Sequence, residues 1–233
     1  MPLMSQEVRW YFPGELARFP ELRQWIETTK PFPEEGTVRP PAFEGRQDDK
    51  PDIYLFVPDA DDMGLKWREG QFQIKGRTSR RGVQRFAHHF YGAVETWAKW
   101  SYEGDDVKHA FAGWFDGSPG RAWQPVSVRK TRLLRKTRLD ARGRHVEVAA
   151  TAFPDRGLNV ELTDLEIGGQ RYCSLGFEAY PDDTSLADSF VDVVSAWLED
   201  LEITRAVLAE HQSMGYPEFL RKRAQFQLAI AAK

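Results

Sequence analysis

The sequence contains very little that would suit an exported or membrane-embedded protein. Its 233 residues include one cysteine, Cys173, so no disulfide can form within the chain, which is typical of the reducing cytoplasm. Residues 1–7 have no basic segment leading into an apolar one, so no secretory signal peptide is predicted. No apolar run approaches the length of a membrane span. Together these absences predict a soluble, cytoplasmic protein.

A strong net charge is also missing. The 32 Lys and Arg residues nearly balance 35 Asp and Glu residues, for a net charge of -3 at pH 7, whereas a general nucleic-acid binder is normally strongly basic. The phosphate-binding motif Gly-x-x-x-x-Gly-Lys-Ser/Thr, the Gly-x-Ser-x-Gly elbow of hydrolases and Cys-x-x-Cys are absent. Any anion site must therefore be a local concentration of cations.

Residues 65–77 are the most distinctive segment that is present. Two alternating runs flank Glu69-Gly70, and a two-residue turn there predicts an antiparallel hairpin with Trp67 opposite Phe72. One face of that hairpin is apolar, and the other carries Lys66, Arg68, Lys75 and Arg77. Four cations with no acid among them repel one another unless water or an anion lies over them. Two interpretations are open, namely the solvated face of an ordinary sheet and a phosphate-binding surface.

A second basic strand is predicted over residues 126–139. Arg129 alternates with Val126 and Val128, but the alternation breaks near Leu133-Leu134, which suggests a β-bulge and leaves the face of Arg132 unassigned. A solvated edge strand protected by Lys and Arg is an equally open interpretation.

The carboxylates gather in a later hairpin over residues 159–180, turning at Gly168-Gly169. The register counted from that turn makes Glu161 and Glu178 diagonal neighbours on one polar face, within reach of a shared cation. Two solvated glutamates on an exposed sheet are the alternative.

The remaining segments complete an α+β pattern. We predict strands at 7–12, 52–57, 94–102 and 146–153, helices at 15–27, 107–114 and 188–210 and from 216 onward, and loops at 31–51 and from 80 onward.

The order of these motifs along residues 7–220 resembles the CYTH superfamily of triphosphate tunnel metalloenzymes, which includes inorganic triphosphatases, thiamine triphosphatases and class IV adenylyl cyclases. The motifs are an acidic N-terminal strand, Leu-Lys-Trp-Arg, Gln-Ile-Lys-Gly-Arg, Val-Arg-Lys-Thr-Arg and Phe-Glu-Ala-Tyr. The resemblance implies a single α+β domain over residues 1–233. Its fold would be a closed or nearly closed antiparallel β-barrel (about residues 5–180) with flanking helices and a C-terminal helical segment (about residues 185–230).

The resemblance also implies a site inside that barrel. Its phosphate-binding residues would be Lys66, Arg68, Lys75, Arg77, Arg129 and Arg132. Its metal ligands would be Glu7, Glu161 and Glu178, holding Mg²⁺ or Mn²⁺. The partner would be a small-molecule polyanion (a triphosphate, polyphosphate or nucleotide) rather than a nucleic acid or a membrane.

The N-terminal Glu-x-Glu-x-Lys signature of that family is incomplete here. Glu7 matches its first glutamate, but Arg9 replaces the second and Tyr11 replaces the lysine. A guanidinium in place of a carboxylate reverses the local charge and predicts weak metal binding. Two functions therefore remain open: a metal-dependent triphosphatase, and a non-catalytic anion- or nucleotide-binding module that has lost the metal centre. A third interpretation, an interaction protein whose eight Trp residues mark a partner surface, has less support, because tryptophans are equally expected in barrel walls.

Overall fold

The computed structural model describes residues 2–32, 46–47, 51–57, 59–115, 123–181, 184–204 and 207–231, with residues 46–47, 184–185 and 224–231 as backbone alone. The strands are β1 (Leu3–Pro13), β2 (Arg46–Gln47), β3 (Asp52–Phe56), β4 (Met63–Arg68), β5 (Gln71–Phe86), β6 (Phe90–Tyr102), β7 (Gln124–Leu139), β8 (His145–Val148), β9 (Gly157–Ile167) and β10 (Gln170–Tyr180). The α-helices are α1 (Pro20–Thr28), α2 (Asp105–Phe111), α3 (Thr184–Leu198) and α4 (Tyr216–Ala231).

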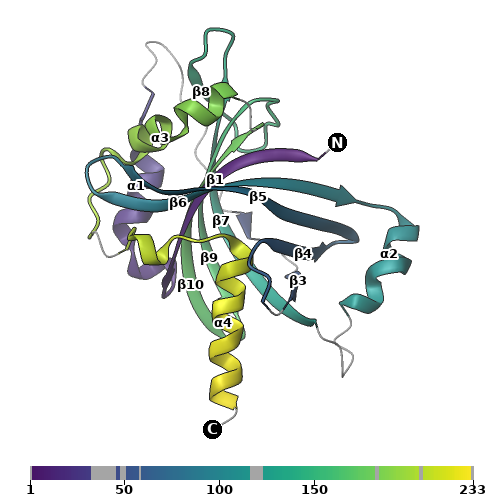
Figure 1. Cartoon of the computed structure of the whole chain (residues 1–233). Helices are drawn as coiled ribbons and strands as arrows, with labels where there is room; N and C mark the ends of the chain where they lie inside the picture. Colours follow the sequence, from purple (N-terminus) through teal and green to yellow (C-terminus); the bar gives the residue numbers. More distant parts are fainter. Residues whose placement is uncertain are drawn as a thin grey trace.

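Eight of the strands close into an antiparallel barrel. They follow one another around it in the order β7-β3-β4-β5-β6-β1-β10-β9, and β9 pairs back onto β7. The short strands β2 and β8 add onto β7. The C-terminal helix α4 extends away from this barrel (Figure 1). The predicted α+β fold, with a closed barrel and a C-terminal helix, is confirmed.

Both predicted hairpins are present in the predicted registers. Trp67 lies opposite Phe72, and Glu69 and Gly70 both have positive φ angles (48° and 84°), which is the turn conformation that matches the twist of a two-residue hairpin. In the later hairpin Glu161 lies opposite Gly176. Because side chains alternate along a strand, these registers also fix which residues point into the barrel.

Three sequence predictions of local structure are wrong, and a fourth, the strand at 146–153, ends already at Val148. A loop was expected from Arg80 onward, but β5 continues to Phe86. Its pairing with β6 shifts register twice, between Arg77 and Ser79 and between Arg80 and Gly82. β7 pairs with β9 without a register shift from Val128 to Arg138, so no bulge explains the broken alternation. The break arises because inward positions of β7 carry cations instead of apolar residues.

The third error concerns α3, which ends at Leu198 and not at residue 210. Leu201 and Leu208 are buried beyond that end, so their helix-like spacing reflects burial of a non-helical segment. Most of the predicted loop 31–51 lies outside the described residues.

The largest apolar cluster lies outside the barrel wall, under α1 and α3. Outward-facing Trp10 and Phe177 meet Trp25 of α1 and Trp197 of α3 there, and the Trp25 indole donates a hydrogen bond to the Trp197 carbonyl (2.9 Å). The inward faces of the strands carry the charged residues and also a second buried apolar cluster, in which Tyr11, Tyr54 and Val128 meet Phe219 of α4. None of the described helices combines the length and the apolar character needed to cross a membrane.

Candidate functional site

The barrel encloses a cavity of about 180 Å³ with a surplus of positive charge. Its charged lining consists of six cations and three carboxylates, namely Arg9, Lys66, Lys75, Lys99, Lys130, Arg132, Glu7, Glu161 and Glu178. The cations exceed the carboxylates by three, although the whole chain has a net charge of -3. A field of this sign inside low-dielectric walls attracts anions.

Glu7 and Glu178 form the first of three charged groups. They lie directly opposite each other on β1 and β10, and the Lys75 ammonium contacts Glu7 and lies 3.8 Å from Glu178. Burial, only partly offset by Lys75 and reinforced by Glu178, raises the pKa of Glu7 to about 7. Burial also opposes ionisation of Glu178, but Lys75 and a hydrogen bond from Asn159 outweigh it and lower its pKa to about 2. At pH 7 Glu7 is therefore about half protonated, while Glu178 is ionised.

Arg9 is the centre of the second group. Its guanidinium lies 2.7 Å from the Glu161 carboxylate, which Arg132 approaches to 3.7 Å from β7. Gly176, opposite Arg9 on β10, makes this position available, because a Cβ atom there would lie 2.5 Å from Cζ of Arg9. Burial opposes ionisation of Glu161, but Arg9 and Arg132 together hold its pKa well below its usual range. Glu161 is therefore a counter-ion for two arginines.

The third group surrounds Asp52, whose side chain is 2% exposed. Lys130, Arg68 and Lys66 approach its carboxylate to 3.0, 3.3 and 3.8 Å. One carboxylate cannot neutralise three cations, and burial together with the neighbouring Lys130 lowers the pKa of Lys66 to about 7. Burial also lowers the pKa of Lys130 and of Lys99. Burial is the main cause of all three depressed lysine pKa values, and an anion placed beside these lysines would raise them.

The N-terminal end of α4 contributes to the cavity wall. Tyr216, Pro217 and Leu220 line the cavity, and Phe219 stacks on Tyr11 with ring centroids 4.0 Å apart. Tyr11, at the position of the family's signature lysine, therefore packs against α4 instead of supplying a cation.

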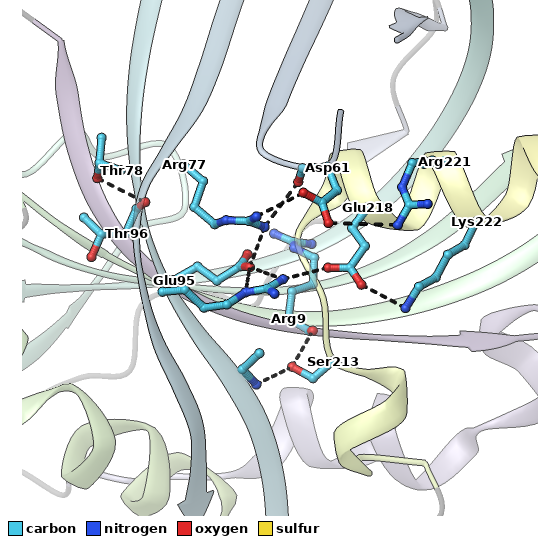
Figure 2. A network of polar contacts seen from close by, with 12 residues as sticks. Arg9, Asp61, Arg77, Thr78, Glu95, Thr96, Ser213, Glu218, Arg221 and Lys222 are labelled. Carbon is cyan, nitrogen blue, oxygen red and sulfur yellow. Dashed lines mark hydrogen bonds and ion pairs between the residues drawn. The ribbon is translucent and has the colours of Figure 1, made fainter. Parts of the chain in front are cut away.

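A polar network joins α4 to the barrel (Figure 2). Glu218 of α4 pairs with Arg80 of β5 (2.9 Å), and Arg221 approaches Asp61 to 3.9 Å. Figure 2 shows Arg77 between Asp61 and Glu95, with nitrogen–oxygen distances of 3.1 and 2.9 Å.

The structure brings together only part of the predicted site. Lys66, Lys75 and Arg132 line the cavity, as do the three predicted metal ligands Glu7, Glu161 and Glu178. The other predicted phosphate-binding residues are not among the lining residues of the described chain: Arg68 pairs with Asp52, Arg77 belongs to the network beside α4, and Arg129 is exposed on the outer face of β7.

Sequence reasoning missed two lining cations, Lys99 and Lys130, and did not include Arg9 among the predicted phosphate-binding residues. Lys130 shares its strand face with Val126 and Val128, so that face looks apolar in the sequence. Counting the alternation straight through residues 126–136 would have placed Lys130 and Arg132 on one face. Lys99 gives no comparable signal, because it lies among the aromatic residues of β6.

The three predicted metal ligands do not form a metal site. Glu161 is engaged by Arg9, while Glu7 and Glu178 share Lys75. Within the part of the chain that the structure describes, no three His, Cys, Asp or Glu side chains are grouped so that they could hold a metal ion. Mg²⁺ and Mn²⁺ require several oxygen ligands without a competing cation between them, so these residues do not fit a protein-held metal.

No protein-family model and no curated protein matches this chain.

The raised pKa of Glu7 gives a pH-dependent contribution to stability. Its folded pKa of about 7 exceeds its ordinary value of 4.5, so its contribution is fully present below pH 4.5 and is lost as the pH rises through 7. We expect the melting temperature of Glu7→Gln to rise relative to the wild type between pH 5 and pH 8, by on the order of 5–10 °C. Thermal unfolding followed by circular dichroism measures this, with exposed Glu202→Gln as the control. A difference that is constant with pH would show that Glu7 is ionised throughout.

Proposed function

We propose that this protein binds a small polyphosphate-type anion in the barrel cavity, through fixed cations and without a metal ion held by the protein. The observation that carries the proposal is the surplus of three cations over carboxylates in the lining. Phosphate oxygens are the natural partners of such a cluster, because they spread negative charge over several hydrogen-bond acceptors. Binding would also raise the depressed pKa values of Lys66, Lys99 and Lys130.

Arg9 supports the non-catalytic interpretation of the CYTH resemblance. The signature carboxylate of the family would contribute to a metal centre, whereas a guanidinium supplies positive charge directly and offers five hydrogen-bond donors. Gly176 gives Arg9 the room it needs, and Glu161 orients it. A binding module that has replaced metal by arginine accounts for both features.

A metal-dependent triphosphatase is the second candidate, and the pairing of Glu7 with Glu178 favours it. Two facing carboxylates could contact a Mg²⁺ or Mn²⁺ ion that arrives already bound to the phosphate substrate. This candidate requires Lys75 to leave the pair, which is why we rank it second.

The distinguishing experiment is calorimetric titration with inorganic tripolyphosphate, in EDTA and in Mg²⁺, alongside an assay for released phosphate. We expect EDTA to leave the affinity within about threefold and no phosphate to be released. Raising the salt concentration should weaken binding, as expected for a charge-dominated site. Binding and hydrolysis that require Mg²⁺ would favour the triphosphatase, and no binding under either condition would refute the proposal.

A further inference from the structure

One of the six cations that line the cavity has no carboxylate partner. The other five each approach a carboxylate, namely Glu161 for Arg9 and Arg132, Glu7 for Lys75, and Asp52 for Lys66 and Lys130. Within the part of the chain that the structure describes, the Lys99 ammonium makes no hydrogen bond and no ion pair. Burial lowers the pKa of Lys99 in spite of Glu178 and Glu7, which both already interact with Lys75. Lys99 is therefore the lining cation whose charge is least compensated.

Lys99 belongs to a patch of cavity-lining residues on three adjacent strands. Lys75 of β5 lies opposite Lys99 of β6, and Gln73 of β5 lies opposite Lys66 of β4. All four line the cavity, and we call them the lysine patch. Burial, Lys130 and Lys99 together lower the pKa of Lys66, so the ammonium groups of the patch are near enough to repel one another. An anion over the patch would remove this repulsion.

Different kinds of phosphate group fit the lysine patch differently. A terminal phosphate carries a charge of about -1.5 to -2 near pH 7 and offers three acceptor oxygens, one for each ammonium group. An internal phosphate of a chain or ring carries less charge and has fewer free oxygens, because it is esterified or condensed on both sides. The patch therefore favours a terminal phosphate group.

We infer that Lys66, Lys75 and Lys99 form a subsite for a terminal phosphate, and that Lys99 makes the cavity prefer a terminal phosphate to an internal one. Lys99 is not among the residues that the family resemblance assigns to phosphate binding. The ligand class is then an anion that ends in a phosphate group, whereas cyclic phosphates bind weakly. This inference rests on the proposed function, because it concerns the anion of the same cavity.

Calorimetric titration with inorganic diphosphate and with cyclic trimetaphosphate, in EDTA at pH 7, tests the inference. The two anions carry similar charges, but diphosphate has terminal phosphates and trimetaphosphate has none. We expect the wild type to bind diphosphate at least about tenfold more tightly, because one additional hydrogen bond between charged groups contributes at least that factor. Lys99→Met should reduce the preference to about threefold or less, mainly by weakening diphosphate binding. Lys30→Met, which removes an exposed lysine beyond α1, is the matched control and should keep the full preference.

Two further measurements separate a direct role of Lys99 from a general one. Arg132→Met removes a lining cation outside the lysine patch, so it should weaken the binding of both anions and keep the preference for diphosphate. Lys99→Met should melt no lower than the wild type, because its ammonium has no partner in the free protein whose loss would destabilise the fold. A marked fall in its melting temperature would show that Lys99 has a structural role and would overturn the inference.

Three results of the titrations overturn the inference while leaving the proposed function in place. They are a wild-type preference below about tenfold, a preference above about threefold that persists in Lys99→Met, and an equal loss of preference in Arg132→Met. Failure of diphosphate to bind while inorganic tripolyphosphate binds has the same consequence. If tripolyphosphate does not bind either, the proposed function itself is wrong and the inference is lost with it.

Discussion

Replacing Lys75 by methionine should weaken tripolyphosphate binding at least about 100-fold. Hydrogen bonds to charged groups contribute roughly 1.5–3 kcal/mol each, so the lost ammonium alone accounts for about 10- to 100-fold. The substitution also leaves Glu7 and Glu178 facing the ligand without their shared cation. Two carboxylates that repel the incoming phosphates add to the loss. Calorimetric titration at pH 7.5 in EDTA measures the change, and a thermal melt verifies that the variant is folded.

Arg129→Met is the matched control for Lys75→Met, because it removes one cation from the outer face of the barrel and not from the cavity. Its tripolyphosphate affinity should stay within about threefold of the wild type, since exposed charges at a distance are largely screened by salt. Adding Glu7→Gln to Lys75→Met should recover part of the lost affinity by removing one of the two freed carboxylates. Equal losses in Arg129→Met and Lys75→Met would mean that net charge, and not the cavity, governs binding.

The registers of both hairpins were predictable because a two-residue turn fixes the pairing on either side of it. The turn at Glu69-Gly70 places Trp67 opposite Phe72. A register shifted by one residue would move every side chain of the strand to the opposite face of the sheet. Closure of the barrel was a different matter, since it depends on β7 pairing with β9 and also with β3. Only the family resemblance, and no local signal, predicted that closure.

The cavity cations were harder to predict because a polar residue inside a barrel breaks the apolar-in pattern on which sequence reasoning depends. Arg129 looked like part of the site, while its neighbour Lys130 looked like part of an apolar face. The structure shows the reverse, with Lys130 in the cavity and Arg129 exposed. In β7 the cations that line the cavity occupy inward positions, where the sequence pattern would lead one to expect apolar core residues.

Arg9 and Tyr11 of β1 each contact residues of other elements. Arg9 is accommodated by Gly176 and balanced by Glu161. Tyr11, two positions further along the same inward face, stacks on Phe219 of α4. Arg9 supplies fixed positive charge to the cavity, and Tyr11 packs against the helix that forms part of the cavity wall. These contacts suit the proposed binding by fixed cations better than binding by a metal ion.

Arg9→Glu should convert this cation-filled site into one that responds to metal. The change removes the guanidinium from Glu161 and adds a second carboxylate beside it, which should cost about 3 kcal/mol in metal-free buffer. For a chain of this size the melting temperature should then fall by roughly 6–12 °C. The carboxylates at positions 9 and 161, without the Arg9 guanidinium between them, would give Mn²⁺ oxygen ligands, so millimolar Mn²⁺ should raise the melting temperature of the variant by several degrees. Metal-free binding of tripolyphosphate should be lost.

Arg9→Gln separates the two effects of that substitution, because it removes the cation without adding a carboxylate. It should be destabilised as well, but its melting temperature should not respond to Mn²⁺. The wild type should respond by less than about 1 °C, since Arg9 and Lys75 already neutralise its carboxylates. A wild-type shift as large as that of Arg9→Glu would mean that the natural cavity accepts a metal ion despite Arg9, and the triphosphatase would then become the better account of the site. A shift confined to Arg9→Glu would identify Arg9 as the residue that keeps the wild-type cavity from binding Mn²⁺.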